Sequence, residues 1–119
     1  MVRELDVIPL LFLADVLITD ASSVANEYAL LDRPLVYLDV PELIQASRDV
    51  GAFVDLETWG RRGGVVVERP AEVEAAVADS LAHPARLAPI RAAIVRDLFY
   101  HPGKATEAAS AWFADRFLS

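Results

Sequence analysis

Three short and uninterrupted apolar runs, separated by segments with helical spacing, constrain the fold of this chain more than any other feature. The runs are Val-Leu-Ile-Thr at 16–19, Leu-Val-Tyr-Leu at 35–38 and Val-Val-Val at 65–67. Strands that are apolar at every position, rather than at every second one, are typical of a parallel sheet covered on both faces. The sequence therefore predicts a doubly wound, three-layer α/β fold, in which helices cover both faces of a Rossmann-like parallel sheet of three to four strands.

The segments beside these runs carry apolar residues at helical spacing. We expect helices over 6–14, after 20–23 and ending before Pro34, over 41–47, from Pro70 onward, and on either side of a break at 101–103. The predicted apolar faces are Leu5, Ile8 and Phe12; Val24, Tyr28 and Leu31; Val73, Val77 and Leu81; and Leu87, Ile90, Ile94 and Leu98. In the last helix, Trp112, Phe113 and Phe117 have core spacing, which indicates packing. A weak fourth strand is expected at 52–54, and a glycine-rich loop at 59–64.

Composition excludes several classes of function. The 119 residues suffice for one domain over 1–119, and they include no cysteine, which excludes disulfides and thiolate metal sites. The two histidines, His83 and His101, are too few for a three-histidine metal site, so we predict no metal and no cofactor. The formal net charge of −7 argues against a nucleic-acid partner, which needs a basic surface.

The sequence also lacks membrane and export signals. Its longest stretch without a charged residue is 7–14, whereas a spanning helix needs roughly 20 apolar residues. The N-terminus has no small-residue cleavage pattern after an apolar run, so a signal peptide is not expected. We therefore predict a cytoplasmic protein.

A polar turn follows the first apolar run, as Asp20-Ala21-Ser22-Ser23-Val24. In open parallel sheets, ligands bind at the carboxyl ends of the strands. Backbone N–H groups at a helix start carry a partial positive charge of about half a unit. With the Ser22 and Ser23 hydroxyls, these groups form a candidate diphosphate cradle. The alternative is that Asp20 and the serines only cap a helix, which spacing alone favours.

Other candidate residues are more ambiguous, and the sequence has neither a G-x-G-x-x-G nor a P-loop motif. Glu27 lies one turn past the serines and is suited to ribose or sugar hydroxyls, or is an ordinary surface glutamate. Gly103 and Lys104 precede the last helix and are suited to a phosphate, or form a simple helix joint. Arg61 and Arg62 are predicted to be solvated.

Three segments together resemble the C-terminal part of the CDP-glycerol glycerophosphotransferases, the polymerases and primases of bacterial teichoic-acid synthesis. Residues 14–24 and 27–34 are similar to the family's Asp, apolar strand, Thr-Asp-Tyr-Ser-Ser and Ala-Leu-Leu-Asp-Arg-Pro. Residues 103–106 are similar to the last four residues of its Asp-Gly-Lys-Ala-Ser, with Pro102 in place of the aspartate. Ala21 stands where tyrosine is usual, and Glu27 where aspartate is usual. The order and spacing of the segments match, so the resemblance spans nearly the whole chain.

The resemblance implies the C-terminal, donor-binding half of a GT-B fold enzyme. In the full-length enzyme, glycerol phosphate would pass from CDP-glycerol to a polyol-phosphate or lipid-linked acceptor. The implied donor-phosphate ligands are Asp20, Ser22, Ser23 and Val24. Glu27 is implied as a polyol or ribose ligand, and Gly103 and Lys104 as phosphate contacts in the same pocket.

The resemblance also bears on activity and assembly. The family's catalytic histidines lie upstream of the matching strand, outside this chain, so we expect no catalytic residue here and no turnover by the chain alone. With opening strands absent, the sheet edge at 16–19 is expected to mediate homo-oligomerisation. Peripheral association with the inner membrane face would require missing segments. Two alternatives are a non-catalytic, self-associating α/β module and the donor half of a nucleotide-sugar glycosyltransferase or epimerase.

Overall fold

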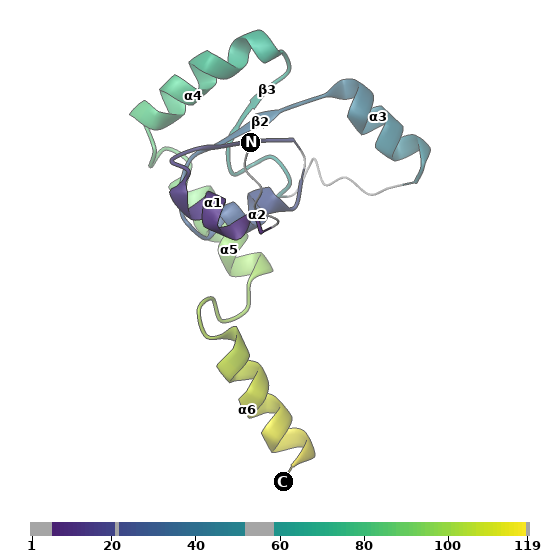
Figure 1. The fold of residues 1–119 in the computed structure, drawn as a ribbon, viewed down its shortest axis with the longest axis vertical. Helices are drawn as coiled ribbons and strands as arrows, with labels where there is room; N and C mark the ends of the chain where they lie inside the picture. The colour runs from purple at the N-terminus through teal and green to yellow at the C-terminus, as the bar shows by residue number, and fades with distance from the viewer. Residues whose placement is uncertain (1–5, 21, 52–58, 119) are drawn as a thin grey trace.

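A computed structural model describes residues 6–20, 22–51 and 59–118 (Figure 1). Its elements are α1 (Ile8–Leu13), β1 (Leu17–Thr19), α2 (Val24–Ala29), β2 (Leu35–Leu38), α3 (Pro41–Asp49), β3 (Val65–Val67), the 3₁₀ helix η1 (Pro70–Glu72), α4 (Val73–Ala82), α5 (Ala88–Leu98) and α6 (Ala105–Phe117). The three strands and the helices predicted from the apolar pattern are thereby confirmed. The weak strand expected at 52–54 lies outside the described residues.

The strands form one parallel sheet in the order β1-β2-β3. Leu17 is in register with Leu35, and Val36 with Val65. In the described part of the chain, β1 pairs with β2 alone, so it is an edge strand, at the position where the sequence predicts an edge. The chain has the predicted α/β, Rossmann-like architecture.

The middle strand β2 is buried on both faces, which explains its uninterrupted apolar run. Leu35 and Tyr37 pack with Leu11 of α1 and Tyr28 of α2 on one face. On the other face, Val36 packs with Val67 and with Ala76 of α4. Figure 1 shows α4 on the opposite side of the sheet from α1 and α2.

The edge strand β1 is less buried than predicted. Ile18 is 49% exposed, although the sequence predicts a buried strand at 16–19. The reason is that the helices of this small sheet cover its centre more completely than its margin. The compact apolar run at 16–19 therefore predicts the strand correctly, but it does not predict how deeply the strand is buried.

The predicted helix faces are partly wrong. In α1, Ile8 and Phe12 are exposed and Leu11 is buried, because a helix that is apolar almost all round gives no single face to select. Leu81 of α4 and Leu98 of α5 are also exposed. Ile94 of α5 is buried as predicted, and the two helices also bury residues that the apolar spacing does not single out: Ala76, Ser80 and Arg91.

The aromatic residues of α6 do not pack into the core, contrary to the prediction. Trp112, Phe113 and Phe117 are 54%, 59% and 63% exposed, and contact one another at ring-centroid distances of 5.4–5.9 Å. The chain adopts positive φ at His101 and Gly103, 52° and 76°, and α6 then runs away from the sheet (Figure 1). This break, which the sequence predicts, separates α6 from the layers that its aromatic spacing suggested it would cover.

Arg33, in the segment between α2 and β2, ties that segment to the end of α1. Arg33 donates from Nη1 to the carbonyl oxygens of Phe12 at 2.8 Å and Ala14 at 2.6 Å. The Tyr28 hydroxyl donates to the same Ala14 oxygen at 2.7 Å. These bonds satisfy carbonyl groups at the end of α1, which fixes where β1 begins.

None of the helices in the described ranges is long and apolar enough to cross a membrane.

Candidate functional site

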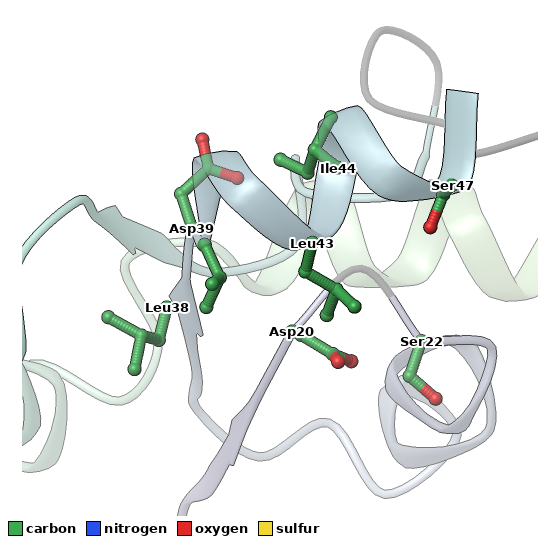
Figure 2. A pocket seen from close by; sticks show the side chains of 8 residues that line it. Asp20, Ser22, Leu38, Asp39, Leu43, Ile44 and Ser47 are labelled. Carbon is green, nitrogen blue, oxygen red and sulfur yellow. The ribbon is translucent and has the colours of Figure 1, made fainter. Parts of the chain in front are cut away.

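A pocket of about 250 Å³ opens at the carboxyl ends of β1 and β2, beneath α3. This is the edge of a parallel sheet at which ligands bind. Its lining comes from the turn after β1, from the end of β2 and from α3: Asp20 and Ser22; Leu38, Asp39 and Val40; and Leu43, Ile44 and Ser47 (Figure 2). Two residues of the turn predicted from the sequence, Asp20 and Ser22, therefore line this pocket.

The serines of the turn lie at the start of α2. Ser22 is exposed and lines the pocket, and Ser23 is the residue before the first helical position. The Ser23 side chain makes no capping hydrogen bond to α2, and its backbone is already in the right-handed helical region. The capping role that spacing favours is therefore not performed by the Ser23 hydroxyl.

The other predicted residues lie elsewhere. Glu27 is exposed on α2 and does not line the pocket, and Val24 begins that helix. Gly103 and Lys104 line a separate hollow with 105–107, which shares no residue with the pocket. Figure 1 shows this connection between α5 and α6 well away from α3. The structure thus does not bring Gly103 and Lys104 together with the serine turn, and their roles stay predictions.

Sequence reasoning missed one wall of the pocket and its ion pair. Leu43, Ile44 and Ser47 belong to α3, a helix with no buried residue. Asp39 directly follows β2, so the rule that located the turn after β1 would also have found this residue. Nothing local in the sequence indicates its partner, Arg61.

Arg61 is not simply solvated, contrary to the prediction. Its guanidinium forms a hydrogen-bonded ion pair with the Asp39 carboxylate, and the two side chains are only 25% and 16% exposed. Arg62 instead lies over the Trp59 ring, 5.3 Å from its centroid. The loop at 59–64 therefore places the positive charge of Arg61 against the carboxylate of Asp39, which lines the pocket.

The lining combines acidic, hydroxyl and apolar groups. Asp20 and Asp39 supply carboxylates, Ser22 and Ser47 supply hydroxyls, and the remaining residues are apolar. No lysine, arginine or histidine belongs to the set of described residues that line it. Across the described ranges there is also no group of three or more histidine, cysteine or acidic residues arranged to hold a metal.

Comparison with known families identifies the chain. The family model described as CDP-glycerol:poly(glycerophosphate) glycerophosphotransferase matches residues 1–108. The chain belongs to this family. The match confirms the resemblance seen in the sequence. The matched range contains both the serine turn and Gly103–Lys104. The aromatic residues Trp112, Phe113 and Phe117 lie beyond the matched range. None of the curated proteins compared, and none of the solved structures, matches the chain.

Proposed function

We propose that this chain binds the nucleotide-activated donor of a glycerophosphotransferase, CDP-glycerol, and that Ser22 and Ser23 contact its diphosphate. The observation that carries the proposal is the position of Asp20 and Ser22, which line a pocket at the carboxyl ends of β1 and β2, with Ser23 next to them in the chain. Membership of the family supplies the chemical identity of the donor. The sheet supplies the location, since ligands bind at this edge in open α/β folds.

The serine hydroxyls are the main donors in this proposal. Helix α2 is only six residues long, so its dipole adds little to anion binding. A hydroxyl that is not used for capping is available to donate to a phosphate oxygen, and a hydrogen bond to a charged group is worth about 1.5–3 kcal/mol. Ser23 meets this condition with respect to its own helix.

In the reaction of such a transferase, an acceptor hydroxyl attacks the β-phosphorus of CDP-glycerol. A new P–O bond forms, the bond from the β-phosphorus to the bridging oxygen breaks, and CMP departs with that oxygen. The acceptor's proton passes to a general base. Donors at the serine turn would stabilise the charge that develops on the diphosphate. The acceptor, a polyol phosphate or a lipid-linked polyol in teichoic-acid synthesis, would bind outside the pocket.

The chain's own histidines do not supply a general base at this pocket. His83 Nδ1 lies 3.1 Å from the carbonyl and carboxylate oxygens of Asp79, and His101 packs edge-on against Tyr100. Neither histidine lines the pocket. We therefore expect this polypeptide to bind the donor without transferring glycerol phosphate, and clear turnover of CDP-glycerol with an added acceptor would contradict this.

Calorimetric titration of CDP-glycerol and CMP tests the proposal. We expect saturable binding of CDP-glycerol, weakened about tenfold or more by Ser22→Ala or Ser23→Ala, because each removes a hydrogen bond to a charged group. Ser110→Ala, on exposed α6, is the matched control and should bind like the unsubstituted chain. Absence of binding, or equal binding by all variants, would contradict the proposed site.

One observation favours a second candidate, a self-associating module. β1 is an edge strand in the described part of the sheet, and Ile18 on it is half exposed, so a second copy has a strand with which to pair. Light scattering over a range of concentrations tests this. A chain that dimerises through Ile18, loses the dimer on Ile18→Lys and binds no nucleotide would replace the donor-binding proposal.

A donor half for nucleotide sugars is the remaining alternative. Such sites commonly place a glycine in the turn after the strand, whereas this turn carries Ser22 and Ser23. Competition between UDP and CDP for the pocket distinguishes the two. Preference for CDP supports the glycerophosphotransferase proposal, and preference for UDP supports the alternative.

A further inference from the structure

The pocket's charges do not suit the diphosphate that the serine turn is proposed to bind. Two of its lining residues, Asp20 and Asp39, carry carboxylates, and no described lining residue is cationic. A phosphate seated deep in this pocket would face like charge. Carboxylates instead accept hydrogen bonds from hydroxyl groups, and a hydroxyl bound to a carboxylate makes a strong, charge-assisted bond.

We propose that the pocket beneath α3 holds a vicinal diol of the donor, and that the Asp20 carboxylate accepts hydrogen bonds from those hydroxyls. The diphosphate then lies at the rim, beside Ser22 and Ser23. This inference rests on the proposed function and deepens it. It changes the role of Asp20 from a phosphate ligand, as the family resemblance implied, to the residue that selects the hydroxyl-bearing part of the donor.

The two acidic residues differ in availability. Asp39 is engaged with Arg61, and its side chain is 16% exposed. Asp20 is exposed, and within the described residues it has no ion-pair partner. Asp20 is therefore the acceptor that remains for a ligand hydroxyl, while the Arg61–Asp39 pair limits the negative charge of the pocket.

The opposite wall also fits a polyol. Figure 2 shows Leu43 descending from α3 toward Asp20, with Ser22 and Ser47 at the other end of the hollow. Leu43 and Ile44 provide an apolar surface for the carbon skeleton, and the Ser47 hydroxyl is a second polar contact. At about 250 Å³, the pocket is smaller than the roughly 300–1,000 Å³ typical of complete small-molecule sites, so it suits one part of CDP-glycerol.

Two parts of the donor carry such a diol, the glycerol and the ribose. The test is calorimetric titration of CDP-glycerol, CDP and 2′,3′-dideoxy-CDP into the unsubstituted chain, Asp20→Asn and Asp20→Ala. We expect both variants to bind CDP-glycerol about tenfold or more weakly, because each removes the charged acceptor. If the diol is that of glycerol, CDP binding is unchanged. If it is that of ribose, CDP binding falls as well, and binding of the dideoxy nucleotide is unaffected.

Control variants keep the result interpretable. Asp97→Asn removes an exposed carboxylate from α5, outside the pocket, and should leave all three affinities unchanged. Ser47→Ala should weaken the same ligands as Asp20→Asn. Equal or tighter binding of every ligand by Asp20→Asn would overturn the inference while leaving the proposed function intact. An unsubstituted chain that binds none of the three ligands would overturn both.

Discussion

The guanidinium of Arg61 pairs with the carboxylate of Asp39, where β2 ends and the pocket begins. The two residues are 22 positions apart, so the pair links the glycine-rich loop to the edge of the sheet. It places a positive charge against Asp39, a residue of a pocket that is lined by acidic, hydroxyl and apolar groups.

Removal of Arg61 should weaken donor binding. Arg61→Ala leaves Asp39 uncompensated, and the added negative charge repels a diphosphate at the rim. We expect CDP-glycerol affinity to fall several-fold, about 1 kcal/mol, and the loss to shrink as salt screens the repulsion. Arg62→Ala, which removes an arginine packed on Trp59 instead, is the control. Calorimetry at low and high ionic strength measures both, and a salt-independent loss would contradict the electrostatic explanation.

Arg91 should be important for stability although it is charged. It is 2% exposed, donates from Nε to Asp32 Oδ1 at 2.8 Å and from Nη2 to the Pro84 carbonyl at 2.8 Å, and so ties α5 to two turns. We expect Arg91→Ala to lower the free energy of unfolding by about 2–4 kcal/mol, through lost packing and an unpaired carbonyl. Arg96→Ala, at a side chain 74% exposed, should cost less than about 0.5 kcal/mol. Urea unfolding of both variants measures these two losses. Equal losses would contradict the role of the buried bonds.

Gly64 should not tolerate a side chain. A Cβ there would lie 2.3 Å from the Leu35 carbonyl oxygen, which belongs to the central strand. Gly64→Ala must displace β2 or β3, so we expect a loss of about 3 kcal/mol or more, or failure to fold. At Gly63 the nearest atom is the Ile94 Cδ1 at 2.9 Å, the end of a side chain that can move, and Gly63→Ala should cost less. Thermal melting compares the two, and the reverse order would show the contact at Gly64 to be unimportant.

Tyr37 should destabilise the fold at alkaline pH. Burial raises the pKa of Tyr37 from 10.0 to about 12. Above pH 10 the unfolded chain loses this proton while the folded chain retains it, so stability falls between about pH 10 and 12, by roughly 2–3 kcal/mol in total. Burial also raises the pKa of Tyr28, opposed by Arg33, so part of the alkaline loss persists without Tyr37.

Tyr37→Phe provides the matched control for this pH dependence. The Tyr37 hydroxyl is buried without a hydrogen-bond partner in the described structure, so its removal should leave stability at pH 7 unchanged or increased. It should also reduce the loss above pH 10. Urea unfolding at pH 7 and pH 11 gives both values, and an equal alkaline loss in the variant would assign the effect to other groups.

The sequence predicted those features that depend on local pattern. The run at 35–38 indicated a strand buried on both faces, and Leu35, Val36 and Tyr37 are each at most 1% exposed. The turn at 20–24 was located at the ligand edge because the carboxyl ends of parallel strands share that edge, and Asp20 and Ser22 line the pocket there. Both inferences needed only the order of residues along the chain.

Other features depend on contacts between distant residues. Apolar spacing does not distinguish a core face from a pocket wall or an exposed face, so Leu43 and Trp112 could not be assigned from sequence. Leu43 lines the pocket, and Trp112 lies on a helix that the break at His101 and Gly103 directs away from the sheet. The pairing of Arg61 with Asp39 likewise has no local signature.

Backbone amide NMR during titration with CDP-glycerol tests most directly whether this pocket is the donor site. We predict saturable shifts of the Ser22, Ser23, Leu43 and Ser47 amide signals, with those of the exposed helix α6 unchanged. The absence of shifts, or shifts confined to α4 or α6, would contradict the account.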